Sequence, residues 1–163
     1  MWTARVFTLY PDIFPGPLRK GLYGKAFEKK VWNLEVVNIR DYANDKHKTV
    51  DDTPFGGGSG MLLKPDILAK SLDINTKPGE RIFYLSPKGK KFDQETAKDL
   101  SKENTINLVC GHFEGVDERI LQTRKIEEIS IGDYILSGGE SASFVIIDSV
   151  LRLLPGVLGN NTS

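Results

Sequence analysis

Three short segments combine glycines with polar side chains in a way that suits the binding of a flat ligand. They are residues 85–89, 110–115 and 130–140, and each follows an apolar run typical of a buried strand. Glycine lets the main chain approach a ligand closely, so that backbone amides and carbonyls can bind it. One such segment alone is more often a plain tight turn. Three of them at successive strand ends predict a shared binding site.

Other kinds of chemistry find little support in the residue types. Cys110 is the only cysteine, which excludes an intramolecular disulfide, a four-cysteine zinc site and a CxxC redox pair. The two histidines are far apart: His47 lies in a polar stretch and His112 lies inside the second glycine segment. The glycines that begin at Gly56 fail the GxGxxG pattern, because Met61 occupies its last position. Neither a P-loop nor a GxSxG nucleophile elbow occurs.

Length and charge set the broad class of the protein. The 163 residues suffice for one domain, and the 22 basic and 22 acidic side chains cancel. Residues 1–50 carry nine Lys and Arg against five Asp and Glu, whereas residues 101–163 carry five against nine. This asymmetry is compatible with an anionic partner, with self-association or with neither. The chain has no apolar run long enough to cross a membrane and no signal-peptide pattern, so we expect a cytoplasmic protein without membrane contact.

The elements that must position the three segments alternate along the chain. Strands are predicted at 3–9, 34–39, 81–85, 105–110 and 128–131, and helices at 20–30, 65–73, 93–103, 117–125 and 141–154. This order predicts an α/β fold with a largely parallel sheet covered by helices on both faces. In such sheets ligands bind beyond the carboxyl ends of the strands, where the glycine segments lie.

Taken together, the motifs resemble a known family. They are residues 7–14, 50–61, 84–89, 111–119, 130–140 and 155–159, in this order over nearly the whole chain. This pattern is similar to that of the bacterial tRNA (guanine-N1)-methyltransferases of the TrmD type, in the SPOUT superfamily. The resemblance implies a deep trefoil knot near the C-terminus of a 1–159 methyltransferase domain, although knots are otherwise rare. It also implies that residues 160–163 begin a linker and that the family's helical tRNA-binding domain is absent.

The resemblance further implies that the glycine segments bind S-adenosylmethionine, mainly through backbone groups. Residues implied to bind it are Tyr84, Leu85, Ser86, Pro87, Gly111, Glu114, Gly115, Ser130, Ile131, Gly132, Asp133, Tyr134, Ile135, Leu136, Gly138 and Gly139. Apolar members could pack on the adenine faces while the main chain reads its edge. We expect the glycines to be needed because a Cβ would occupy the ligand's volume. Glu114 would assist with the cationic donor or with a magnesium ion.

The implied reaction is transfer of the methyl group to N1 of guanosine 37 in tRNA. It needs close positioning, a base for the N1 proton and a cation near O6. Arg152 matches the family's arginine for the last task, although a solvated residue near a helix end is the plainer interpretation. The family's base follows the 155–159 motif, beyond Ser163. We therefore expect this polypeptide to bind the donor but to transfer methyl poorly or not at all.

RNA contacts and a partner subunit follow from the same resemblance. Lys46, His47 and Lys48 would meet the anticodon branch of the tRNA, where basic side chains contact phosphates. Asp52, Gly57 and Gly58 would lie near the target base. His112 stands where arginine or lysine is more usual. The family acts as a twofold homodimer in which the partner chain completes each active site, and the opposed charges of the two chain ends suit self-association.

Three alternatives stay open. A non-catalytic module that binds S-adenosylmethionine or RNA would differ in the position of the gene's own stop codon. A knotted methyltransferase for another RNA site, such as ribosomal RNA or a ribose hydroxyl, would usually lack the 51–58 motif and would leave a different methylated nucleoside. Without the resemblance, the residues alone indicate an unspecified α/β nucleotide-binding protein.

Overall fold

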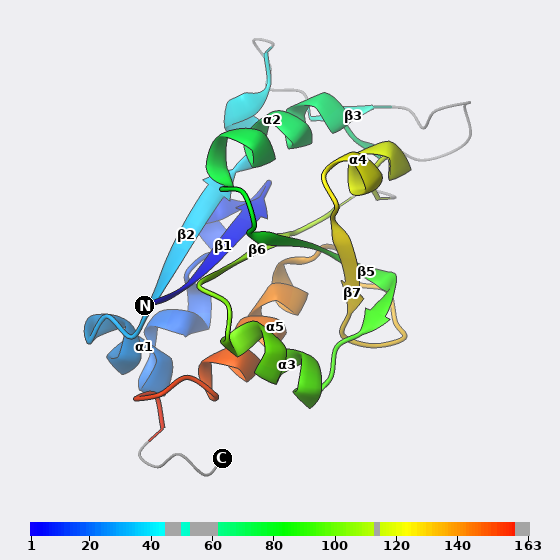
Figure 1. The fold of residues 1–163 in the computed structure, drawn as a ribbon. Helices are drawn as coiled ribbons and strands as arrows, with labels where there is room; N and C mark the ends of the chain where they lie inside the picture. The colour runs from blue at the N-terminus through cyan, green and yellow to red at the C-terminus, as the bar shows by residue number, and fades with distance from the viewer. Residues whose placement is uncertain (45–49, 53–61, 113–114, 159–163) are drawn as a thin grey trace.

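A five-stranded parallel sheet forms the centre of the protein in the computed structural model, which describes residues 1–44, 50–52, 62–112 and 115–158. The strand order is β2-β1-β6-β5-β7, with β1 Trp2–Thr8, β2 Trp32–Asn38, β5 Arg81–Lys91, β6 Thr105–Val109 and β7 Glu127–Ser130. Helices α1 (Gly21–Glu28), α3 (Gln94–Ser101) and α5 (Glu140–Leu151) cover one face, and α2 (Pro65–Asn75) and α4 (Glu118–Thr123) cover the other (Figure 1). The predicted α/β class is confirmed.

Shorter elements complete the chain. Three 3-10 turns, η1 (Pro11–Ile13), η2 (Gly16–Arg19) and η3 (Ile39–Tyr42), follow the ends of β1 and β2. A two-stranded antiparallel ribbon, β3 (Asp51–Asp52) with β4 (Leu62–Leu63), precedes α2. No helix in the described part of the chain has the length and apolar character needed to span a membrane.

Side chains that point alternately to the two faces of the sheet form two separate hydrophobic cores. In β1, Ala4 and Val6 are fully buried against α5, α3 and α1, whereas Phe7 is fully buried in the core under α2 and α4. Successive side chains of a strand point to opposite faces, so a strand covered on both sides must be apolar at nearly every position. This explains why the strand sequences read as continuous apolar runs.

One position in this sheet breaks the apolar rule. Arg5 in β1 is 7% exposed, and its guanidinium donates to Glu35 in β2 and to Glu80 before β5, both at 2.6 Å. It also donates to the Asn107 side chain in β6 at 2.9 Å. The buried charge is tolerated because each of these partners satisfies part of its hydrogen-bonding capacity. Arg5, Glu35 and Asn107 thus form a row of polar side chains across β1, β2 and β6, which we call the polar row.

The predicted elements match the observed ones to within a few residues, with one informative difference. Asp93, where the predicted helix 93–103 begins, caps α3 by accepting a hydrogen bond from the Thr96 backbone at 2.9 Å. The strand predicted to stop at Ser86 instead continues to Lys91. Both Leu85 and Lys90 pair with Ile129 of β7, so residues 86–89 leave the ladder and the chain then returns to it. The polar and glycine residues of this segment therefore form a bulge within one long strand.

Candidate functional site

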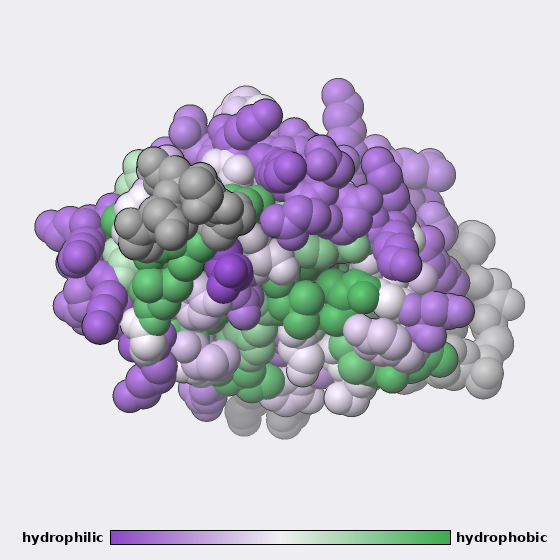
Figure 2. All heavy atoms as spheres, turned by 90° about the horizontal axis from the view of Figure 1, so that it is seen from below, coloured by the Kyte–Doolittle hydropathy of each residue, from purple (hydrophilic) through white to green (hydrophobic). Residues whose placement is uncertain are grey.

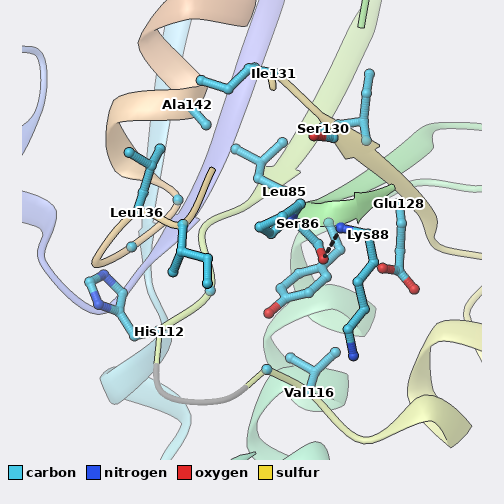
Figure 3. Close-up of a pocket in the computed structure, with 18 of the residues that line it drawn as sticks. Leu85, Ser86, Lys88, His112, Val116, Glu128, Ser130, Ile131, Leu136 and Ala142 are labelled. Atoms are coloured by element: carbon cyan, nitrogen blue, oxygen red, sulfur yellow. Dashed lines mark hydrogen bonds between the residues drawn. The ribbon is translucent and has the colours of Figure 1, made fainter. Parts of the chain in front are cut away.

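A cavity of about 730 Å³ opens at the ends of β5, β6 and β7. Its walls are the 84–88 segment of β5, the chain after β6, the end of β7 with the loop that follows, and the start of α5. Figure 3 shows side chains from these segments, among them Leu85, Leu136 and Ala142, around one space. The volume lies within the range of pockets that hold small ligands. Three segments far apart in the sequence are thus brought to one site.

The cavity collects the residues that the sequence singled out. Every described residue expected to bind the donor lines it: Tyr84, Leu85, Ser86, Pro87, Gly111, Gly115, Ser130, Ile131, Gly132, Asp133, Tyr134, Ile135, Leu136, Gly138 and Gly139. Glu114 lies outside the described residues. The grouping agrees with one shared site, while donor binding by these residues stays a prediction.

The structure gives these glycines a role in packing, while their expected role toward the ligand stays a prediction. A Cβ on Gly111 would lie 2.4 Å from the Tyr84 hydroxyl, and one on Gly138 would lie 2.1 Å from the His112 ring. A Cβ on Gly132 would lie 2.3 Å from the Tyr134 ring, and one on Gly139 would lie 2.8 Å from the Cys110 Cα. The space that these glycines leave free is filled by the protein itself. They let the three segments pack against one another and so shape the cavity indirectly.

Lys88, His112 and Ser137 also line the cavity; they lie in the three predicted segments but were not named among the donor-binding residues. The lining residues that lie outside those segments were not predicted from the sequence: Val116, Glu118, Leu121, Glu128, Ile129 and Ala142. Glu128 is placed there by strand pairing, since it lies opposite Tyr84 in the β5–β7 ladder. This register cannot be read from either strand alone. Ala142 reaches the cavity because α5 begins directly after the third loop. Its only signal in the sequence is its position just after the 130–140 motif.

Tyr84 forms part of the cavity wall and is almost fully enclosed. Burial, with a smaller contribution from the charge of Glu128, raises the pKa of Tyr84 to about 12. The phenol therefore stays protonated at neutral pH. An uncharged wall here suits an aromatic or apolar part of a ligand.

The raised pKa of Tyr84 has a measurable consequence at alkaline pH. An unfolded tyrosine ionises near pH 10, so the stability that comes from the protonated phenol is present below that pH and lost as pH rises through 12. Between pH 9 and 12 the parent protein should lose about 2–3 kcal/mol more unfolding free energy than Tyr84→Phe. Urea unfolding at several pH values measures this. Equal losses would contradict the buried, protonated state of Tyr84.

His112 joins the cavity to a buried carboxylate. Its Nε2 lies 2.6 Å from Glu140 Oε1, and Glu140 is 4% exposed at the start of α5. The other Glu140 oxygen accepts a hydrogen bond from the Thr8 hydroxyl at 2.6 Å. A buried carboxylate is stable only when such partners satisfy it. The end of β1, the second glycine segment and α5 are therefore tied together at one edge of the cavity.

The remaining predicted residues lie elsewhere or cannot be placed. Lys46, His47, Lys48, Gly57 and Gly58 lie outside the described residues. Asp52 lies in strand β3, and the structure describes its backbone but not its side chain. Within the described part of the chain, no group of three or more His, Cys, Asp or Glu side chains could hold a metal ion.

Arg152 is separated from the cavity of its own chain. It caps the C-terminal end of α5, whereas the cavity meets α5 at Ala142, about 15 Å earlier along the helix axis. Arg152 is exposed, and its positive charge acts on the Tyr23 hydroxyl, which donates to Asp148. Arg152 is not among the residues that line the cavity of its own chain.

Comparison with known proteins gives a consistent result. The family model described as "tRNA (Guanine-1)-methyltransferase TrmD" matches residues 1–163. A tRNA (guanine-N(1)-)-methyltransferase of Pelagibacter ubique (strain HTCC1062) is 76% identical over 163 residues, which is 100% of this chain and 72% of that protein. Proteins with the same description from Bartonella tribocorum and Rhizobium etli are 56% and 49% identical. These matches cover 98% of this chain in both cases and 68% and 69% of the respective relatives.

Proposed function

The chain belongs to the TrmD family of tRNA (guanine-1)-methyltransferases, and we propose that it transfers a methyl group from S-adenosylmethionine to N1 of guanosine 37 in tRNA. The observation that carries this proposal is the cavity, because its walls are built from the family motifs at 84–89, 111–119 and 130–140. In keeping with the family, we also propose that the segments around the cavity form its deep trefoil knot. A bacterial tRNA is modified in the cytoplasm, where we place the protein.

The cavity fits the methyl donor in size and in chemistry. Its volume of about 730 Å³ accommodates a nucleoside with a short side chain. Leu85, Ile131 and Leu136 offer apolar contacts to the faces of an adenine ring, and the loops expose backbone groups that can bind its edge. The donor supplies an activated methyl group on a sulfonium. The chain's part is to hold that group at the open side of the cavity, within reach of the guanine.

The place of Arg152 supports a site shared between two subunits. As guanine N1 is methylated and loses its proton, negative charge builds up at O6, which a nearby guanidinium stabilises. Arg152 lies at the far end of α5 from the cavity of its own chain, so in our proposal it serves the cavity of a second copy. Figure 2 shows apolar areas on the face that carries α1, α3 and α5. Exposed apolar side chains of the described residues include Leu22, Val145 and Ile135, which a homodimer interface could bury.

Magnesium has weaker support than the donor. Glu114 lies outside the described residues, and the described residues contain no cluster of metal-ligating side chains. We therefore route no step through a metal ion. The contacts proposed for Lys46, His47 and Lys48 with the anticodon branch, and for Asp52, Gly57 and Gly58 with the target base, rest on the family resemblance.

Two measurements on the 163-residue polypeptide test the proposed function. Isothermal titration should detect S-adenosylmethionine binding with a stoichiometry of one per chain. Single-turnover incubation with unmodified tRNA, with protein in excess so that slow transfer is detected, should yield 1-methylguanosine on nucleoside digestion. A methylated ribose or a different methylated base would overturn the assigned reaction. Absence of donor binding would overturn the assignment of the cavity.

A further inference from the structure

An exposed aromatic ring stands beside the cavity with no role in the function proposed so far. Tyr10 follows the carboxyl end of β1 and is 44% exposed. Its ring makes an edge contact with the His112 ring, with centroids 4.9 Å apart, and His112 itself lines the cavity. Tyr10 does not itself line the cavity, but it contacts a residue that does. A tyrosine ring has an apolar face and a polar end, which suits contact with a ligand that is partly aromatic and partly polar.

The surroundings of Tyr10 hold it in a fixed place. Its backbone amide donates to the Thr8 hydroxyl at 3.0 Å, and that hydroxyl donates to the buried Glu140. Glu140 also contacts His112 at 2.6 Å, so the aromatic neighbour of Tyr10 is fixed by the same carboxylate. The Arg40 guanidinium also lies near the Tyr10 ring, 5.7 Å from its centroid, and donates to the Leu9 carbonyl at 3.1 Å.

Three planar groups thus form a series that leads to the cavity: the Arg40 guanidinium, the Tyr10 ring and the His112 ring. We call this series the Tyr10 platform. Single-stranded nucleic-acid bases stack on aromatic rings and on guanidinium planes, and a pre-ordered ring loses little conformational entropy when a base binds. The site needs such a contact, because the target guanine must leave its neighbours in the RNA to reach the cavity.

We propose that the Tyr10 platform stacks against a purine base of the substrate RNA, either the target guanine or the base next to it, and so holds that base at the entrance of the donor cavity. This inference rests on the proposed function, since it presumes an RNA substrate. It adds a base-binding surface formed by Tyr10, Arg40 and His112. The surface acts by stacking, and it reads neither O6 nor N1 of the guanine.

A fluorescent RNA isolates the stacking contact. The probe is an anticodon stem-loop RNA with 2-aminopurine in place of guanosine 37, whose emission falls when the base stacks. Because 2-aminopurine lacks O6, its binding does not depend on a cation at that atom. Titrations compare the parent polypeptide with Tyr10→Phe, Tyr10→Leu and Tyr10→Ala. Ile13→Ala is the matched control, since Ile13 is 42% exposed on the turn that follows Tyr10 and belongs to no part of the platform.

Stacking predicts a distinctive order of affinities. Tyr10→Phe should bind the RNA like the parent, whereas Tyr10→Leu and Tyr10→Ala should bind about 5- to 100-fold more weakly and quench less. Ile13→Ala should match the parent, and isothermal titration should give unchanged S-adenosylmethionine affinity for every variant. Retained affinity in Tyr10→Leu would overturn the inference, because leucine keeps the apolar surface without a stacking face. Equal losses in Ile13→Ala, or parallel losses of donor affinity, would overturn it too.

The same titrations separate the inference from the proposed function. If the parent binds both RNA and donor, and all the Tyr10 variants bind the RNA as tightly as the parent does, the platform is wrong and the proposed function stands. If the parent binds the donor but not the RNA, the platform is also overturned. If the parent binds neither ligand, the proposed function fails together with the inference.

Discussion

Gly139→Ala is expected to abolish measurable S-adenosylmethionine binding and to lower the unfolding free energy by about 1–3 kcal/mol. The new Cβ would lie 2.8 Å from the Cys110 Cα and 3.1 Å from the Gly111 backbone nitrogen. Both neighbours are backbone atoms at the buried end of β6, so no side-chain rotation relieves the clash. The Gly139 amide also donates to the Gly111 carbonyl at 3.0 Å, and this bond must lengthen when the third loop retreats.

Isothermal titration and urea unfolding on the same samples measure the two effects of Gly139→Ala. Ser141→Ala is the control, because Ser141 is exposed two residues further along, is not among the residues that line the cavity, and loses only a hydroxyl. Circular dichroism shows whether Gly139→Ala is still folded at the temperature of the titration. A folded Gly139→Ala protein with the parent's donor affinity would refute the view that this glycine brings two walls of the cavity together.

Arg152→Ala is expected to leave donor binding unchanged and to slow methyl transfer by about 10²- to 10³-fold, which is typical for the loss of one group that stabilises developing negative charge. Donor binding should survive because Arg152 lies at the far end of α5 from the cavity. The comparison is between isothermal titration and single-turnover formation of 1-methylguanosine. An equal loss in donor affinity and in rate would assign Arg152 a structural role.

A mixing experiment tests whether the arginine acts across two subunits. Alone, Arg152→Ala is expected to keep at most about a hundredth of the parent rate, and Gly139→Ala is expected to be inactive because it does not bind the donor. In a mixed dimer, one site combines an intact cavity with an intact arginine, and random exchange should restore about a quarter of the parent rate. No recovery on mixing, with subunit exchange verified by mass, would show that cavity and arginine must come from one chain.

The local rules of sequence predicted most of this fold. Apolar runs of strand length located all five strands of the sheet, and Asp93 and Asp117 correctly marked the beginnings of α3 and α4. The glycine segments also indicated which strand ends form the cavity. These features depend on neighbouring residues, so a single sequence contains them.

What the sequence did not predict depends on contacts between distant segments. To predict that Lys90 pairs again with β7, one must know the register between β5 and β7. The same register places Glu128 opposite Tyr84. The close approach of Gly138 to His112 requires that the third loop fold back over the second. For the same reason the sequence did not indicate that the missing Cβ atoms of these glycines also make room for other parts of the chain.

The polar row around Arg5 gives the sheet a means of correct alignment. A two-residue slip of a strand keeps every apolar side chain on its proper face, so the two cores alone cannot prevent it. Arg5 faces Glu35 and Asn107 in the native register. Shifted by two residues toward the carboxyl ends of its neighbours, it would face Val37 and Val109, with its charge buried among apolar groups. Arg5, the one buried cation among the described residues, thus penalises this misaligned sheet, which hydrophobicity alone would accept.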